Sequence, residues 1–263
     1  RLSDPDQISP PTERERDALG AHGLAAGMRL ACQTEILGPL RVEVPPESMT
    51  ATQRTQVEGL EGTLEFQPAV RILDLTLPPA ASDDLRADFE RLRAAASREG
   101  RPGLECSNLA AMKQIPGVLR TNQWQVRVVA RGSELVCVEP PGTPVLGMAV
   151  DIGTTKVAGY LVDLATGETL AMKGIMNPQI AFGEDVMARI THCLMHDHGG
   201  EDLQQAITQA LNEVARDLCT EARARKGREA PDYEPSQIVE SVMVGNTVMH
   251  HLLLGLPVAQ LGR

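Results

Sequence analysis

The spacing of apolar residues predicts regular structure most clearly from Val145 to the end of the chain. Three strand-like runs come first, VLGMAVDIG, TKVAGYLVDL and ETLAMKGIM, followed by helices around GEDVMARITHCLMHD and over EDLQQAITQALNEVARDLCTEARARKG. The second helix has one apolar stripe, formed by Leu203, Ile207, Leu211, Val214 and Leu218. SQIVESVMV then predicts a buried strand, and NTVMHHLLLG a helix stopped by glycine and proline. The order βββααβα predicts a mixed sheet with helices on its faces.

The middle of the chain, residues 68–144, predicts a small α+β domain. AVRILDLTLPPA reads as a strand, and SDDLRADFERLRAAASREG as a helix with Asp at its start and apolar Leu85, Phe89 and Leu92. A helix over Asn108–Ile115 precedes a hairpin of WQVRVVA and ELVCVEP, joined through residues 131–133. The proline-rich stretch over residues 140–144 places a domain boundary there.

Residues 1–48 predict an incomplete β-rich unit. TERERDALGAHGL suits a short helix, and two short strands are expected at Leu30–Thr34 and Leu40–Val44. Residues 49–67 are polar and read as a linker. Because the first residue is Arg and the last helical pattern stops at Arg263, we expect that the chain is cut at both ends.

The composition excludes several classes of protein. Hydrophobic residues make up 42% and charged residues 23%, so a disordered or low-complexity chain is excluded. Aromatic residues at 2% and a net charge of -10 argue against nucleic acid and anionic membranes as partners. No apolar run approaches the roughly 20 residues of a spanning helix, and five scattered cysteines without C-x-x-C are typical of reduced thiols. We expect a cytoplasmic protein.

The string DIGTTK, residues 151–156, carries the most chemistry, because it lies where the first strand of the C-terminal sheet turns into the second. Gly153 permits a tight turn, the loop N–H groups and the hydroxyls of Thr154 and Thr155 can bind phosphate oxygens, and Lys156 adds a point charge. Asp151 repels phosphate, so its presence implies a bound Mg²⁺ or its water shell. The alternative is a plain hairpin with turn-favouring residues, which the flanking strands make less attractive.

Three strings together resemble a known family: AVDIGTTKVAGYLVDLATGE, NPQIAFGEDVMARI and VMVGNTVMHHLLLG. The first resembles the phosphate-1 loop of the actin, sugar kinase and Hsp70 ATPase superfamily. The combination is similar to the ferredoxin-fused, ATP-dependent reductive activators of corrinoid proteins. The resemblance implies that residues 145–263 are the N-terminal, ribonuclease H-like part of an actin-like ATPase domain that binds ATP and Mg²⁺.

The same resemblance implies a function, which is reduction of an inactive Co(II) corrinoid to Co(I) at the expense of ATP. Asp151 would be the catalytic residue and hold Mg²⁺ through water, while residues 153–156 would contact the phosphates. The implied partners are a corrinoid protein or corrinoid methyltransferase component and an electron donor, with a homodimer as one assembly state.

The N-terminal strings SPPTERERDAL and GMRLACQ resemble the end of a plant-type [2Fe–2S] ferredoxin domain, a β-grasp fold. Cys32 would then be the fourth iron ligand, separate from a C-x4-C-x2-C group that this sequence lacks. With one of four thiolates, the chain is not expected to assemble the cluster. By residue type alone, Cys32 is more simply an inert buried thiol.

Departures from the family pattern limit the expectation for this chain. No second D-x-G-T string follows Asp151, so half of the nucleotide cleft is missing and we expect weak or no ATP binding by the chain in isolation. Lys156 stands where the family often has a third Thr. A metabolite kinase of the same superfamily and a non-enzymatic actin-like scaffold are the alternatives, and RLACQ argues against the kinase.

Weaker signals come from residues near helix ends. Gly245, Asn246 and Thr247 lie at a strand-to-helix junction, where they could contact the nucleotide or equally well cap the helix. Glu184 and Asp185 are better explained as acids at a helix N-terminus than as ligand contacts.

Four neighbouring residues superficially resemble a metal site: His192, Cys193, His196 and His198. A solvated helix C-terminus explains them better than metal binding does, because Gly199 and Gly200 follow directly.

Overall fold

The computed structural model describes residues 7–31, 33–39, 42, 66–97, 103–227 and 231–262. The chain divides into two compact units, Arg1–Arg54 and Thr55–Arg263, and each is described by itself. The prediction of a mixed α/β protein is confirmed, since the second unit contains two four-stranded sheets that each combine parallel and antiparallel pairs.

The first unit contains the predicted helix, α1 (Glu13–Ala25), which begins with a capping box between Thr12 and Glu15. The predicted strand at Leu30–Thr34 is wrong for the described residues, because Ala31 and Gln33 lie in a turn and the Gln33 N–H donates to the Leu30 carbonyl at 2.9 Å. Apart from Val42, the predicted strand over residues 40–44 lies outside the described residues, as does most of the linker.

The Glu15 carboxylate explains this turn, because it accepts hydrogen bonds from Arg29, from the Leu30 backbone and from Thr34. The Glu15 side chain is fully buried and accepts from the Leu30 N–H at 3.0 Å, the Thr34 hydroxyl at 3.1 Å and the Arg29 guanidinium at 2.8 Å. These charged hydrogen bonds replace the strand pairing that the apolar alternation suggested.

The first sheet of the second unit has the order β1-β3-β4-β2, in which β2 runs parallel to β4 and the other described pairs are antiparallel. Its elements are β1 (Val70–Thr76), α3 (Asp88–Ser97), β2 (Cys106–Ser107), α4 (Leu109–Thr121), β3 (Gln125–Arg131) and β4 (Glu134–Glu139). The predicted hairpin is confirmed as β3 and β4.

Both helices of this sheet differ from their predicted bounds. The first helix starts only at Asp88, and Leu85 is exposed ahead of it, because the Asp84 carboxylate binds Arg86 and Arg91 instead of capping a helix. The second helix, α4, runs through Pro116 to Thr121, since buried residues on both sides of the proline hold it against the sheet.

The second sheet has the order β7-β6-β5-β8 and follows the predicted βββααβα order. Its elements are β5 (Leu146–Ile152), β6 (Lys156–Asp163), β7 (Thr169–Met176), α5 (Val186–Met195), α6 (Gly199–Lys226), β8 (Ile238–Gly245) and α7 (Thr247–Leu254), with short 3-10 turns η2 (Pro178–Phe182), η3 (Pro235–Gln237) and η4 (Ala259–Gly262). Strands β5, β6 and β7 are antiparallel, whereas β8 runs parallel to β5.

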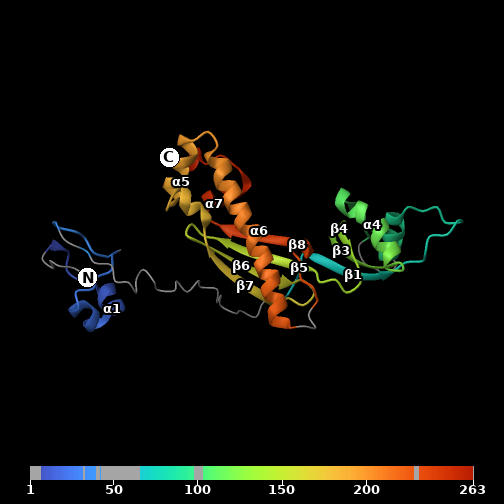
Figure 1. Ribbon diagram of the computed structural model, residues 1–263, viewed down its shortest axis with the longest axis horizontal. Helices are drawn as coiled ribbons and strands as arrows, with labels where there is room; N and C mark the ends of the chain where they lie inside the picture. Colours follow the sequence, from blue (N-terminus) through green and yellow to red (C-terminus); the bar gives the residue numbers. More distant parts are fainter. Residues whose placement is uncertain are drawn as a thin grey trace. The chain divides into compact units, whose positions relative to one another are not determined.

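Helix α6 crosses one face of this sheet, as Figure 1 shows. The predicted apolar stripe of this helix is buried in one core cluster with residues of β5, β6 and β7, and the helix packs mainly against β6 and β7. The prediction that SQIVESVMV is a buried strand is wrong for the described residues, because the Val242 and Val244 side chains of β8 are 55% and 51% exposed. These valines face the side of the sheet opposite α6, where Asp151 is also found.

Candidate functional site

Asp151 lies at the end of β5 with its side chain exposed. Its neighbours in the sheet are Ala158 of β6 and Val244 of β8, and Gly174 of β7 lies beyond Ala158. Such short neighbours leave room around the carboxylate, so a hydrated cation could approach it from the side opposite α6. The residues after Asp151 connect β5 to β6 and form the predicted loop.

Two glycines of the predicted site are required by close backbone contacts. A Cβ added to Gly153 would lie 2.6 Å from the Lys156 carbonyl oxygen, and one added to Gly245 would lie 2.9 Å from the Ile152 carbonyl oxygen. Both distances are shorter than real contacts of a Cβ. Glycine therefore lets the ends of β5 and β8 come together at the loop.

The structure brings two of the predicted motifs together. The Asn246 side chain donates to the Thr154 hydroxyl at 3.2 Å, and its Oδ1 accepts from the Met249 N–H at 3.0 Å as the N-cap of α7. Asn246 is thus a helix cap that also contacts the loop. Thr247 is the first residue of α7, directly after Asn246, and its side chain is exposed.

A layer of buried polar residues lies behind the loop, and sequence reasoning missed it. The layer consists of Asn177, Gln179 and Arg189, which are 1%, 1% and 0% exposed. Asn177 follows β7, Gln179 lies in η2, and Arg189 is in α5. The sequence offered one signal for this layer. Arg189 lies next to Ile190 in the predicted helix, on the side that the apolar residues of this helix indicate is buried.

This buried layer binds three consecutive carbonyl groups of the loop. The Asn177 side chain donates to the Gly153 carbonyl at 2.8 Å, its backbone N–H donates to the Thr155 carbonyl at 2.9 Å, and the Arg189 guanidinium donates to the Thr154 carbonyl. In a trans peptide, the C=O and the following N–H point in opposite directions. The N–H groups of Thr154 and Thr155 therefore point away from the buried layer.

The resulting loop has the polarity that an anion needs. Its carbonyl oxygens, which repel phosphate, are held inward, whereas the N–H groups of Thr154 and Thr155 point the other way and the Thr155 side chain is exposed. Lys156 is the first residue of β6, and its side chain or backbone already interacts with another group of the protein. The arrangement can hold phosphate oxygens, and the nearby exposed carboxylate of Asp151 is a suitable ligand for water-bound Mg²⁺.

Asp185 and the three histidines of the predicted cluster make contacts within the fold. The Asp185 carboxylate caps α5 by accepting from the Ala188 N–H at 2.7 Å, as the helix-end explanation expected, and Glu184 precedes it. His192 stacks on His196, the C-cap of α5, with ring centroids 4.3 Å apart.

No group of three or more His, Cys, Asp or Glu residues suited to a metal occurs among the described residues. His198 instead contacts Glu201 at 3.1 Å, and the two glycines that follow it begin α6. Cys32 lies outside the described residues, so its predicted role as an iron ligand stays a prediction.

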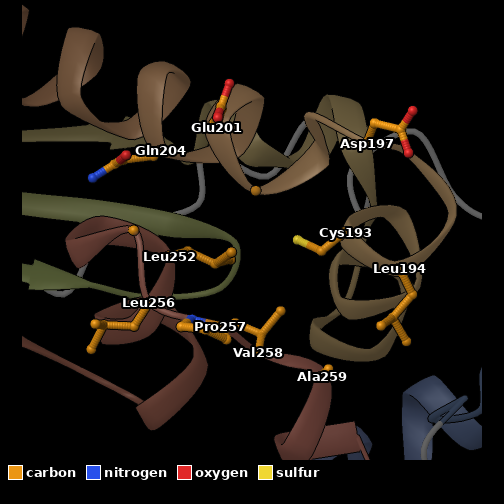
Figure 2. Close-up of a pocket in the computed structure, with 12 residues that line it drawn as sticks. Cys193, Leu194, Asp197, Glu201, Gln204, Leu252, Leu256, Pro257, Val258 and Ala259 are labelled. Atoms are coloured by element: carbon orange, nitrogen blue, oxygen red, sulfur yellow. The ribbon is translucent and has the colours of Figure 1, made fainter.

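A cavity of about 300 Å³ lies apart from the loop, where α5, α6 and the segment after α7 meet (Figure 2). Of the predicted loop, junction and cluster residues, Cys193 alone lines it. The Cys193 thiol points toward the cavity, whereas the Asp197 carboxylate points away. Because burial raises the pKa of Cys193, its thiol is a poor nucleophile, and the cavity offers little chemistry.

A membrane-spanning helix is not found in the part of the chain that the structure describes. The 28-residue helix α6 is long enough to cross a bilayer, but charged residues occur along its length.

Comparison with known proteins gives consistent results. The family model described as the RACo linker region matches residues 59–144, and the one described as the RACo middle region matches residues 146–263. The corrinoid activation enzyme RamQ of Eubacterium limosum is 26% identical over 237 residues, which are 89% of this chain and 37% of RamQ.

A solved structure of a reductive activator for corrinoid, iron-sulfur protein superposes with a TM-score of 0.60 at 29% identity. The match covers 98% of this chain and 42% of that protein. This chain thus spans less than half the length of each relative.

Proposed function

From the premise that the chain belongs to the RACo-type reductive activators of corrinoid proteins, we propose that it takes part in the ATP-dependent reduction of a corrinoid protein from Co(II) to Co(I). Its contribution is the first half of the nucleotide site, within an actin-like ATPase domain that begins near residue 145. The partner is a corrinoid iron-sulfur protein, the kind of protein that the structural relative activates. The inward carbonyls of residues 153–155 are the observation that supports this proposal most directly.

Different residues of the site bind the phosphates and the Mg²⁺ ion. The N–H groups and hydroxyls of Thr154 and Thr155 bind phosphate oxygens, and Asn246 orients the Thr154 hydroxyl. Asp151 holds Mg²⁺ through water, and this cation would neutralise phosphate charge when bound. ATP can drive an unfavourable reduction only by binding one conformation of the protein more tightly than another. The loop provides that difference when a second lobe closes over the phosphates.

The N-terminal unit is proposed to be the end of a β-grasp ferredoxin domain over residues 1–48, followed by a linker at 49–67 and an α+β domain at 68–144. Cys32 is the only cysteine before Cys106, so the donor set of this chain does not fit a complete [2Fe–2S] cluster. We therefore derive no electron-transfer step through a cluster here.

The proposal is tested by following Co(I) absorption when the complete protein that contains this chain is mixed with reductant, Mg-ATP and its corrinoid partner. Asp151→Asn should lower the rate at least about tenfold and weaken its dependence on Mg²⁺. Because Asp151 is exposed, thermal stability should change by less than about 0.5 kcal/mol.

Glu240→Gln is the matched control for this variant. Glu240 pairs with Gly147 and lies on the same face of the sheet as Asp151, away from the loop. Its substitution should leave the rate unchanged. Reduction that proceeds equally without ATP, or an Asp151→Asn variant as fast as the control, would contradict the proposed site.

A further inference from the structure

Arg189 is a buried cation whose guanidinium donates a hydrogen bond directly to the loop. Its guanidinium donates to the Gly183 carbonyl at 3.0 Å, to the Gln179 Oε1 at 3.2 Å and to the Thr154 carbonyl. All three acceptors are neutral. No ion pair joins Arg189 to a carboxylate within the described ranges, although the side chain is 0% exposed.

A buried charge without a counter-charge is costly, even when neutral groups satisfy its hydrogen bonds. Burial lowers the pKa of Arg189, and the charge of Asp185 opposes this shift. An arginine nevertheless keeps its proton in proteins. The guanidinium thus leaves a positive potential next to Thr154 that nothing in the described chain fully compensates.

The direction of this potential matches the polarity of the loop. Arg189 holds the Thr154 carbonyl on the inner side, so the peptide dipole between Thr154 and Thr155 has its positive end on the outer side. The guanidinium charge and this dipole both favour an anion at the loop. In the low-dielectric interior, a charge acts over a longer range than at the surface.

We propose that Arg189 is a positioning residue that both fixes the loop and supplies, for the polyphosphate of the nucleotide, a positive charge that no ion pair in the described ranges neutralises. Gln179 keeps this charge available, because it provides a neutral acceptor where a carboxylate would neutralise the guanidinium. This inference rests on the proposed function of the loop and adds that phosphate affinity is set partly by residues that never touch the ligand.

The test compares Gln179→Glu with Gln179→Met in the complete protein. Both substitutions remove the bond from the Gln179 Nε2 to the Leu203 carbonyl, which is 2.9 Å long, and both preserve side-chain size. Only Gln179→Glu adds a carboxylate beside Arg189. Isothermal titration with Mg-ATP, Mg-ADP and adenosine then separates the charge effect from structural damage.

Relative to Gln179→Met, Gln179→Glu should bind Mg-ATP about tenfold and Mg-ADP about threefold more weakly, with adenosine unchanged, because the effect scales with ligand charge. Equal affinities in the two variants for all three ligands, or an equal loss for adenosine and Mg-ATP, would overturn the inference.

Arg189→Lys provides a second measurement if circular dichroism shows that Gln179→Glu does not fold. Lysine keeps the charge but loses the forked donors, so the ratio of Mg-ATP to adenosine affinity should stay within about twofold of wild type. A folded Arg189→Lys protein that loses this ratio would refute the charge role. Wild-type protein that binds none of the three ligands would instead refute the proposed function itself.

Discussion

Replacing Asn177 with alanine should loosen the loop without altering any group that a nucleotide would touch. The Asn177 side chain donates to the Gly153 carbonyl at 2.8 Å and accepts from the Gln179 N–H at 2.9 Å. The residue is 1% exposed, so solvent has little access to either backbone group in the native fold.

The expected loss follows from these two bonds. Leaving a buried backbone group unsatisfied costs about 1–3 kcal/mol, and two groups are affected, so we expect a loss of about 2–6 kcal/mol in the free energy of unfolding. A loop that is less ordered must also be fixed when a ligand binds, so Mg-ATP affinity of the complete protein should fall at least about tenfold.

Asn108→Ala is the matched control. The Asn108 side chain makes the same pair of bonds in the other sheet of this unit, donating to the Val136 carbonyl at 2.8 Å and accepting from the Ala111 N–H at 2.8 Å. Its substitution should destabilise the protein without changing Mg-ATP affinity. Urea denaturation and isothermal titration measure the two quantities for both variants.

The reasoning would be refuted by either of two results. An Asn177→Ala protein as stable as wild type would show that its two bonds do not hold the loop. An equal loss of Mg-ATP affinity in both variants would show that general destabilisation, rather than loop geometry, weakens binding.

Three further predictions test separate parts of the structure. Gly153→Ala should weaken Mg-ATP binding at least about tenfold, because its Cβ would lie 2.6 Å from a backbone oxygen, whereas Gly117→Ala, with open space at its Cβ, should leave titrations unchanged. Burial raises the pKa of the Cys137 thiol to about 12, so iodoacetamide at about pH 8 should label the exposed Cys106 and spare Cys137. Equal labelling of the two cysteines in peptide maps would contradict this. Hydrogen bonds hold the pKa of Glu15 well below its usual value of about 4.3, so its contribution to stability is complete above that pH and lost as the pH falls below it. Hydrogen exchange of residues 12–34, corrected for intrinsic rates, should rise through that window in wild type and show no such step in Glu15→Gln.

The fold was predictable where the apolar pattern alone decides it. The stripe from Leu203 to Leu218 is buried in α6, and strands β5 to β7 occur where alternation indicated them. The sequence pattern failed where a charged side chain binds backbone or other side chains. Glu15 draws the segment at Leu30 into a turn, and Asp84 binds arginines ahead of α3.

The candidate site was predictable in its loop and not in its support. Gly153 to Lys156 form a local string whose chemistry can be read directly. Asn177 and Arg189 are distant in sequence, and only the fold brings them to the loop carbonyls. Phosphate binding by the loop is a prediction that the Mg-ATP titrations of the Asn177→Ala and Gly153→Ala variants test.

The exposed valines of β8 have a practical consequence for anyone who purifies this chain. In the described residues, β8 pairs on one side only, with β5, and its outer face presents Val242 and Val244. A partly hydrophobic strand with an unpaired edge readily adds a strand from a neighbouring molecule. Concentrated solutions should therefore tend to self-associate through this edge, and Val242→Lys should keep samples dispersed.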